Sequence, residues 1–171
     1  DAWAPPSLGV ERDNNLPPAS SREKLAKLKP VFGKGDDATM TAANSTPLSD
    51  GASTVLLASD EEGERPGWTV LAHLVDYETA AVDYVSGAEG LLMAPAYPVA
   101  RMLARQGLSL QDFDFYEIHE AFAGQVLTTL AAWEDPAFCK EKLGLDEPLG
   151  SIARSKLNVK GSSLATAHPF A

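Results

Sequence analysis

Two histidines stand in settings that could support acid–base chemistry. His168 lies in "NVKGSSLATAHPFA" (residues 158–171), a stretch of small residues that lets the backbone approach a ligand or another loop closely. His119 opens "HEAFA" at an expected strand-to-helix junction, the edge where α/β proteins bind ligands. An imidazole with a pKa near ~6.5 can move a proton at neutral pH. The two rings could share one site, one moving a proton and one positioning a polarised oxygen, or they could be unrelated.

Other familiar reaction motifs do not fit the spacing. Cys139, in "PAFCKEKLG", has no nearby histidine or glycine-rich turn, so we expect an inert, partly buried thiol. A zinc-protease helix needs a second histidine where Ala123 stands, and Gly-x-Ser-x-Gly needs glycine where Ala165 stands. No Gly-x-Gly-x-x-Gly or phosphate-loop pattern occurs. We therefore expect no metal site and no serine hydrolase.

The charge distribution restricts the partners. The 171 residues carry a net charge of −10, which argues against general nucleic-acid binding. Residues 22–34 are the exception, with five Lys or Arg and one Glu, so five minus one gives +4. This run is either a solvated helix face or a patch for an anionic ligand such as a phosphate-bearing cofactor.

Location and completeness follow from simple features. No apolar run approaches the ~18 residues of a membrane span, so none is predicted. A single cysteine fits a reducing compartment, and we expect a cytoplasmic protein. The opening "DAWAPPSLG" has no Met and no signal-peptide pattern, so we expect the sequence to begin within a longer protein.

Helical and strand patterns alternate along the chain, which predicts an α/β fold. We expect helices over 21–29, over 51–59 with Asp50 as N-cap, over 94–107 ending at Gly107, and over 119–133. In the last helix an apolar stripe should face the core, formed by Phe122, Val126, Leu130 and Trp133. A buried strand over 68–77 would contain His73 as a satisfied structural histidine, and a short strand would cover 113–118. Residues 61–67 should form a polar turn, and about 134–156 a surface insertion with short helical pieces.

Three ordered segments resemble the thiolase family: "TAANSTPLSDGA" (41–52), "HEAFA" (119–123) and "NVKGSSLATAHPFA" (158–171). "KLAKLKPVF" before the first segment is also similar. The chain resembles 3-ketoacyl-CoA thiolases (acetyl-CoA acyltransferases), and histidine at 119 resembles the subgroup of fatty-acid β-oxidation trifunctional complexes. This resemblance implies a thiolase-like fold, a layered α/β structure with two similar core halves that the chain covers in part. Residues 1–46 would be the tail of the CoA-binding loop domain, 47–68 the end of the first core half, and 69–171 the start of the second.

The resemblance also implies roles for individual residues. His168 matches the histidine of the family's Gly-His-Pro motif, which would deprotonate a nucleophilic cysteine and help hold the thioester oxygen. His119 would orient a water or donate to the developing oxyanion. Phe122 would line the acyl and pantetheine channel, Thr46 would bond the pantetheine arm, and Asn44 would support that loop. Both family cysteines would lie outside the 171 residues.

The implied reaction is cleavage of 3-ketoacyl-CoA by CoA to acetyl-CoA and a shortened acyl-CoA. CoA and acyl-CoA would be substrates with no permanently bound cofactor, and the protein would be a homodimer or homotetramer with a possible β-oxidation complex partner. Ala167 replaces the family's glycine and Lys160 a usual asparagine. With the absent cysteines, these departures suggest the alternative of a non-catalytic acyl-CoA-binding or scaffold protein. The isolated 171 residues should be inactive and fold poorly, because strands would lack partners.

Overall fold

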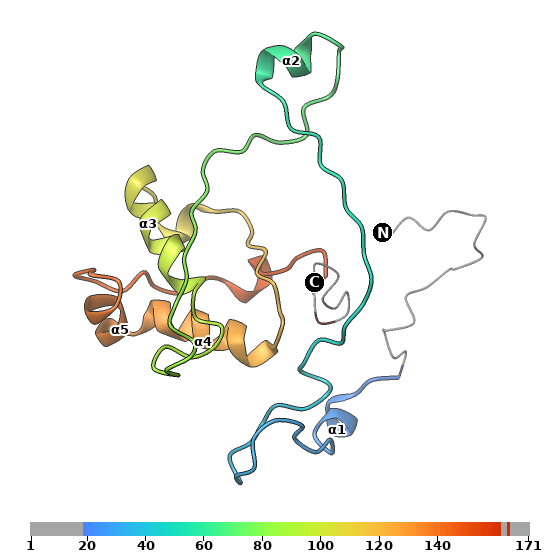
Figure 1. Ribbon diagram of the computed structural model, residues 1–171, viewed down its shortest axis with the longest axis vertical. Coiled ribbons are helices and arrows are strands. Elements are labelled where there is room, and N and C mark those ends of the chain that lie inside the picture. The colour runs from blue at the N-terminus through green and yellow to red at the C-terminus, as the bar shows by residue number, and fades with distance from the viewer. Residues whose placement is uncertain (1–18, 162–163, 165–171) are drawn as a thin grey trace.

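The computed structural model describes residues 19–161 and residue 164 (Figure 1). The described helices, in chain order, are α1 (Arg22–Leu25), α2 (Asp60–Glu64), α3 (Ala96–Gln106), η2 (Leu110–Asp112), α4 (Ala123–Glu134), α5 (Pro136–Glu141) and η3 (Arg154–Lys156). Within the described part, β-pairing consists of three isolated bridges: Pro30 with Thr41 and Ser45 with Phe122, both antiparallel, and Tyr116 with Leu157, parallel. The helix expected over 21–29 is thus confined to α1.

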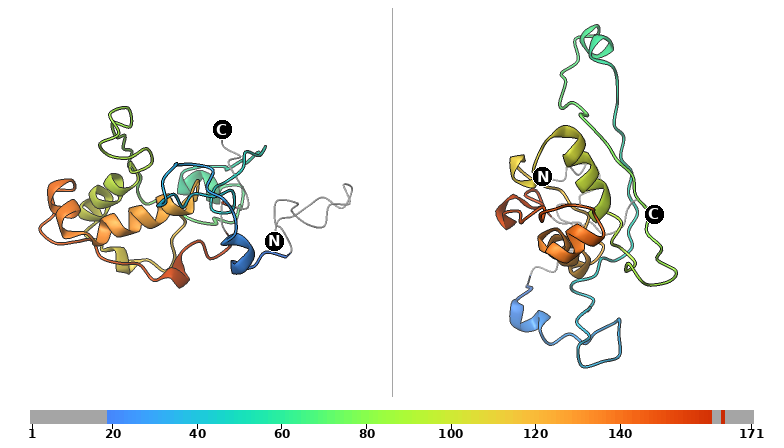
Figure 2. Two further views of the ribbon diagram at one scale, coloured as in Figure 1. Left: turned by 90° about the horizontal axis from the view of Figure 1, so that it is seen from below. Right: turned by 90° about the vertical axis from the view of Figure 1, so that its left-hand side faces the viewer.

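The core lies where α3, α4 and α5 come together, on one side of the molecule (Figures 1 and 2). Leu103 of α3 is only 4% exposed, and Val126, Leu130 and Trp133 of α4 are equally buried. The indole Nε1 of Trp133 donates to the carbonyl of Ala96 at 3.2 Å, so its polar atom is satisfied inside this core. The predicted apolar stripe of α4 is therefore confirmed over its last three positions.

Local signals set the limits of the longer helices. Gly107 has φ +64°, the left-handed conformation of a helix C-cap, and the amide of Leu108 donates to the carbonyl of Leu103 at 3.0 Å. The predicted end of α3 is confirmed. Helix α4 starts at Ala123, four residues later than predicted, and Phe122 is its half-buried N-cap in extended conformation. His119 and Glu120 therefore precede the helix.

The prediction of a helix over 51–59 is wrong, and the polar turn predicted over 61–67 is confirmed only at residues 65–67. Residues 51–59 are extended and exposed, whereas the acidic segment forms α2. The hydroxyl of Ser59, and not the Asp50 carboxylate, caps this helix by accepting from the amide of Glu62 at 3.3 Å. Three acidic residues in the first turn also favour a helix start there, because they complement the helix dipole.

The predicted strand over 68–77 is absent, and its apolar side chains face solvent. Leu71 is 93% exposed, and Leu74 and Val75 are also exposed. A strand is stabilised by hydrogen bonds to a neighbouring strand, and no described segment pairs with this one. The strand over 113–118 is reduced to the single bridge at Tyr116. Residues 68–77 instead run as an open path outside the core formed by α3, α4 and α5 (Figure 1).

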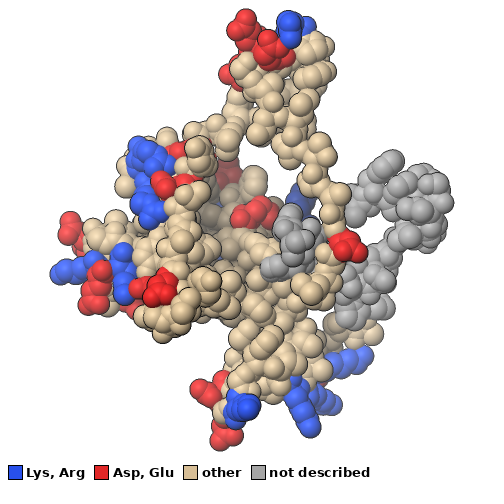
Figure 3. Space-filling model, viewed as in Figure 1, with Lys and Arg blue, Asp and Glu red and all other residues tan. Residues whose placement is uncertain are grey.

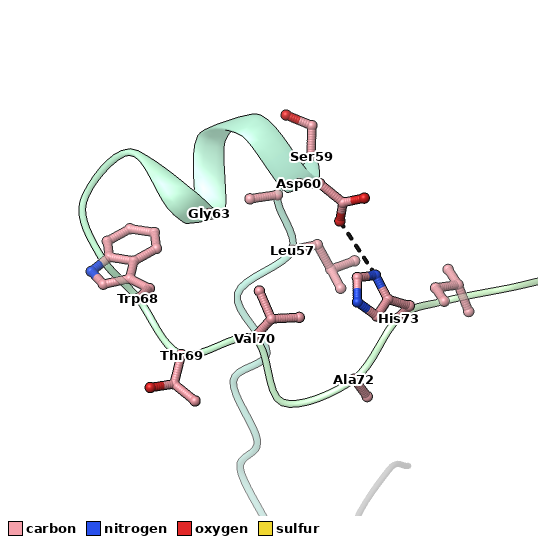
Figure 4. A pocket seen from close by; sticks show the side chains of 11 residues that line it. Leu57, Ser59, Asp60, Gly63, Trp68, Thr69, Val70, Ala72 and His73 are labelled. Carbon is pink, nitrogen blue, oxygen red and sulfur yellow. Dashed lines mark ion pairs between the residues drawn. The ribbon is translucent and has the colours of Figure 1, made fainter.

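His73 was predicted to be a satisfied histidine in a buried strand, and this is wrong. Its side chain is 65% exposed, and its Nδ1 lies 3.3 Å from an oxygen of Asp60. The two residues border an open hollow of about 540 Å³ between α2 and residues 68–74 (Figure 4). An exposed pair of this kind contributes little to stability.

One charged cluster joins this exposed segment to α3. The Arg105 guanidinium donates to both oxygens of Asp76, at 2.8 and 3.0 Å, and to Glu78 at 2.8 Å. Hydrogen bonds from Arg105 and then from Gln106 lower the pKa of Asp76 to about 2. The same guanidinium lowers the pKa of Glu78. The carboxylates are therefore held in their charged form against the end of the helix.

The region over 134–156 contains the short helical pieces that were predicted, α5 and η3. The Asp135 carboxylate caps α5 by accepting from the amide of Ala137 at 2.7 Å. Cys139 is 0% exposed, with its sulfur 3.4 Å from the carbonyl oxygens of Ala132 and Trp133. The thiol is thus fully rather than partly buried, and the region packs on α4.

Candidate functional site

Two segments far apart in sequence pair at the start of α4. The amide of Thr46 donates to the carbonyl of Ala121, and the amide of Ala123 donates to the carbonyl of Asn44, each at 3.0 Å. The first amides of a helix have no partner within it, and the N-cap Phe122 makes no side-chain cap bond. The carbonyl of Asn44 supplies the missing acceptor, so the pairing fixes both segments.

The side chains of the 44–46 segment brace the loop before it. The side-chain amide of Asn44 accepts from the backbone amide of Thr41 at 2.8 Å and donates to the backbone carbonyl of Thr39 at 2.9 Å. The Thr46 hydroxyl donates to the carbonyl of Pro47 at 3.0 Å, and the residue is half-buried. Two predicted site residues, Asn44 and Thr46, therefore lie together beside a third, Phe122.

Phe122 connects this site to the basic segment. Its ring stands edge-to-face against Phe32, with centroids 5.8 Å apart. Phe32 lies in a turn closed by the amide of Val31, which donates to the carbonyl of Met40 at 2.8 Å. Sequence reasoning did not single out Phe32, although "KPVFGK" places an aromatic residue inside the basic run.

The basic segment surrounds a hollow at the same end of the molecule. A cavity of about 470 Å³ lies between α1 and residues 38–44, and its lining includes Leu25, Leu28 and Asn44. The lysines and arginines of residues 22–34 are exposed, and Figure 3 shows Lys and Arg side chains gathered at this end, around α1. The arrangement offers an apolar hollow beside positive charge.

His119 lies two residues before Ala121, the first residue of the paired segment 121–123. It is exposed and borders a hollow of about 410 Å³ whose lining also includes Leu91, Val99, Gln125 and Trp133. The hollow is mostly apolar, and His119 is one of its few polar lining residues. Such a setting suits a group that meets an apolar ligand carrying one polar centre.

Asn158 contacts Ile118, the residue before His119, and sequence reasoning did not single it out. Its side-chain amide accepts from the amide of Ile118 at 2.8 Å and donates to the carbonyl of Ile118 at 3.0 Å. It is the only non-glycine residue of the described part with a positive φ, +50°. An asparagine three residues before Gly161 was a turn signal that could have drawn attention to it.

Several predicted features can be placed only in part. His168 and Ala167 lie outside the described residues. Lys160 is described and exposed, in the turn that follows Asn158. Among residues 19–161 and 164, no group of three or more His, Cys, Asp or Glu is arranged to hold a metal ion. No helix in that same part of the chain has the length and apolarity to cross a membrane.

Comparison with known proteins places the sequence in a family. The family model "Thiolase, N-terminal domain" matches residues 6–61, and "Thiolase, C-terminal domain" matches residues 68–171. The chain belongs to the thiolase family. The 3-ketoacyl-CoA thiolase of Alteromonas mediterranea is 44% identical over 171 residues, covering 99% of this chain and 38% of that relative.

Solved thiolases share the fold. The dimeric peroxisomal thiolase of Saccharomyces cerevisiae matches with a TM-score of 0.70 at 33% identity, over 94% of this chain and 35% of its own. Human mitochondrial 3-ketoacyl-CoA thiolase in complex with CoA matches with a TM-score of 0.66 at the same identity and coverage. The predicted thiolase-like α/β fold is confirmed, and the chain spans about two fifths of the curated relatives' length.

Proposed function

We propose that the protein containing this chain is a 3-ketoacyl-CoA thiolase, which cleaves 3-ketoacyl-CoA with CoA to acetyl-CoA and a shortened acyl-CoA. The observation that carries the proposal is the pairing of residues 44–46 with 121–123. It brings two thiolase motif segments together at the start of α4. The similarity to 3-ketoacyl-CoA thiolases at 44% identity supports the same reaction.

In the proposed reaction a cysteine thiolate attacks the 3-keto carbonyl. The carbon–carbon bond breaks, acetyl-CoA leaves after its carbanion takes a proton from a second cysteine, and the acyl group stays on the nucleophile. The thiol of CoA then gives its proton back to the second cysteine and attacks this acyl-enzyme, releasing the shortened acyl-CoA and returning the nucleophilic thiolate. Cys139 is the one cysteine in the sequence and is fully buried, so neither role falls to it. Both cysteines belong to other parts of the whole protein.

The histidines would activate the nucleophile and stabilise charge. A thiol with a pKa near ~8.5 is mostly protonated at neutral pH, so His168 as base would raise the thiolate fraction. His119, which lines the apolar hollow, would donate to the developing oxyanion or orient a water that does so. A well-placed donor of this kind contributes about 3 kcal/mol to transition-state stabilisation.

CoA would bind along the face that includes Asn44, Thr46 and Phe122. Thr46 would hydrogen-bond the pantetheine arm, Phe122 would line its channel, and Asn44 would hold the loop in place through its two backbone bonds. The apolar hollow beside α1, flanked by a run with charge +4, suits a nucleotide that carries phosphates. No single lysine is assigned to a phosphate.

The cellular setting and domain limits form part of the same proposal. Residues 1–46 would end the CoA-binding loop domain, 47–68 the first core half, and 69–171 would begin the second. The whole protein would act in fatty-acid β-oxidation in the cytoplasm, as a homodimer or homotetramer that can join a β-oxidation complex. The yeast relative is described as dimeric, which supports an oligomer.

The test is thiolysis of a 3-ketoacyl-CoA by the full-length protein, measured as CoA-dependent release of acetyl-CoA. We expect His168→Ala to lower kcat by about 10³-fold or more, because the thiolate is no longer generated by a positioned base. His119→Ala should lower kcat by about 10²–10³-fold, the usual loss for one oxyanion donor. Wild-type turnover in His168→Ala would refute the proposal. Gln111→Ala, a change on η2, is the control and should retain activity.

A second candidate is an acyl-CoA-binding or scaffold protein without turnover. Ala167 in place of the motif glycine and the exposed Lys160 in place of the usual asparagine favour it. Calorimetry with CoA, combined with intact-mass detection of an acyl-enzyme after addition of 3-ketoacyl-CoA, separates the two candidates. CoA binding without any acyl-enzyme would support the scaffold.

A further inference from the structure

We infer that Asn158 is a positioning residue for His119. Its side-chain amide holds in place the peptide bond between Ile118 and His119. The inference rests on the proposed function for its catalytic consequence, and on the geometry alone for its structural part. Nothing in the chemistry described above requires Asn158 to touch substrate.

Two hydrogen bonds join the side chain of Asn158 to the backbone of Ile118. The Ile118 amide donates to Oδ1 of Asn158 at 2.8 Å, and Nδ2 of Asn158 donates to the Ile118 carbonyl at 3.0 Å. Two residues of antiparallel strands exchange bonds in this way through their backbones. Here a side chain takes the place of one strand. The carbonyl of Ile118 belongs to the peptide bond that leads into His119, so the second bond holds the plane of that peptide.

The backbone of Asn158 adds a third bond and redirects the chain. Its amide donates to the carbonyl of Tyr116 at 2.8 Å, continuing the parallel bridge between Tyr116 and Leu157. Its φ of +50° then turns the chain, and its own carbonyl accepts from the amide of Gly161 at 3.0 Å. The residue that fixes the approach to His119 therefore also sets the start of the segment that carries His168.

Asparagine meets both requirements at once. Its amide has a donor and an acceptor in one plane, and it adopts left-handed φ values more readily than most other residues. Aspartate has the shape but, when ionised, lacks the donor. Glycine accepts the positive φ but has no side chain, and glutamine is one carbon too long for the same pairing. The two demands together explain why a non-glycine residue occupies this left-handed position.

The test compares Asn158→Gly and Asn158→Asp with wild type in the full-length protein. Asn158→Gly keeps the turn without strain and removes both side-chain bonds. We expect kcat for thiolysis to fall about 10²-fold, the loss expected when a catalytic group is displaced by about 1 Å, while KM changes by less than about 3-fold. Gln111→Ala is the matched control, because the Gln111 amide also joins two segments by donating to the carbonyl of Ser151 at 2.9 Å, and its kcat should stay at the wild-type level.

Asn158→Asp supplies a readout that a general loss of folding would not produce. A protonated carboxyl group regains the donor that the carboxylate lacks, so the ratio of mutant to wild-type kcat should rise as pH falls. A ratio that does not change with pH, or a kcat of Asn158→Gly equal to wild type, would overturn the inference. A raised KM with unchanged kcat would also overturn it, because that pattern indicates a role in binding alone.

A measurement without turnover keeps this inference separate from the proposed function. Hydrogen exchange in the peptide covering residues 116–121 should be faster in Asn158→Gly than in wild type, while exchange in α3 is unchanged. Equal exchange rates in 116–121 would refute the positioning role. If the wild-type protein shows no thiolysis but the exchange difference is present, the proposed function fails and the structural part of the inference stands.

Discussion

Two regions of the chain differ in how far their apolar side chains are buried from solvent. In the helical unit, residues 92–158, the apolar side chains of α3 and α4 are buried against each other. In the extended arm, residues 47–85, apolar residues such as Leu48, Leu71 and Val85 lie exposed. The helices of this unit form most of their backbone hydrogen bonds internally, whereas extended chain must find its partners in other segments. The comparison teaches that the core of the unit bearing His119 and Asn158 is formed by its own residues, whereas the start of α4 also depends on Asn44.

The arm is not independent of the unit, because Arg105 of α3 holds Asp76 and Glu78. Arg101 adds a bond to the carbonyl of Thr79 at 2.6 Å. These polar contacts fix one short stretch of the arm without burying its apolar residues. Ionic and polar contacts therefore join the two regions at residues 76–79.

The largest expected effect on the free energy of unfolding is a difference between two leucine-to-alanine variants. Leu103→Ala removes a buried side chain from the helical unit and should lower the free energy of unfolding by about 2–5 kcal/mol. Leu71→Ala in the arm changes a side chain that is 93% exposed and should alter it by less than about 0.5 kcal/mol. Urea unfolding followed by circular dichroism at helix wavelengths measures both. Equal losses in the two variants would contradict the division into two regions.

Replacing each of two glycines in the helical unit by alanine should change the free energy of unfolding in opposite directions. Gly107→Ala forces a Cβ into the left-handed cap of α3 and should cost about 1 kcal/mol, although no atom blocks the added group. Gly124→Ala lies inside the first turn of α4, also in open space, and should stabilise by about 0.5–1 kcal/mol. The same urea experiment measures both, and a stabilising Gly107→Ala would refute the capping role.

The smallest expected effect concerns the contact between arm and unit. Because the pKa of Asp76 is lowered from 3.8 to about 2, its contribution is fully present above pH about 3.8 and is lost as pH falls toward 2. In Arg105→Gln the largest cause of the shift is removed, so the pKa should return toward its ordinary value. NMR titration of the Asp76 carboxyl measures this, and an unchanged midpoint in Arg105→Gln would assign the shift to other groups.

The sequence predicted local features well and distant pairings poorly. The end of α3 at Gly107 and the buried stripe of Val126, Leu130 and Trp133 followed from capping and periodicity, which act within a few residues. The proximity of Thr46 to Phe122 was implied only by the family resemblance, because spacing alone does not show which loops meet. The strand over 68–77 had the right composition, but composition does not supply a neighbouring strand.

The errors at α2 and Asn158 have different origins. Asp50 and Ser59 are both good N-cap residues, and the acidic residues after Ser59 decided between them. Asn158 was overlooked because its importance depends on Ile118, which is distant in sequence. A side chain that pairs with a remote backbone leaves only a weak signal in its own segment.

The most direct test of the central claim is amide hydrogen exchange along the 171-residue chain, read peptide by peptide. In contrast to the poor folding expected from the sequence, we expect strong protection in α3 and α4 and measurable protection at residues 116–121, with residues 51–58 and 68–75 exchanging at the rate of unstructured chain. Protection of the arm equal to that of α3 and α4 would contradict this expectation. So would a helical unit that exchanges as fast as the arm, because the residues around His119 would then not be organised by this part of the chain.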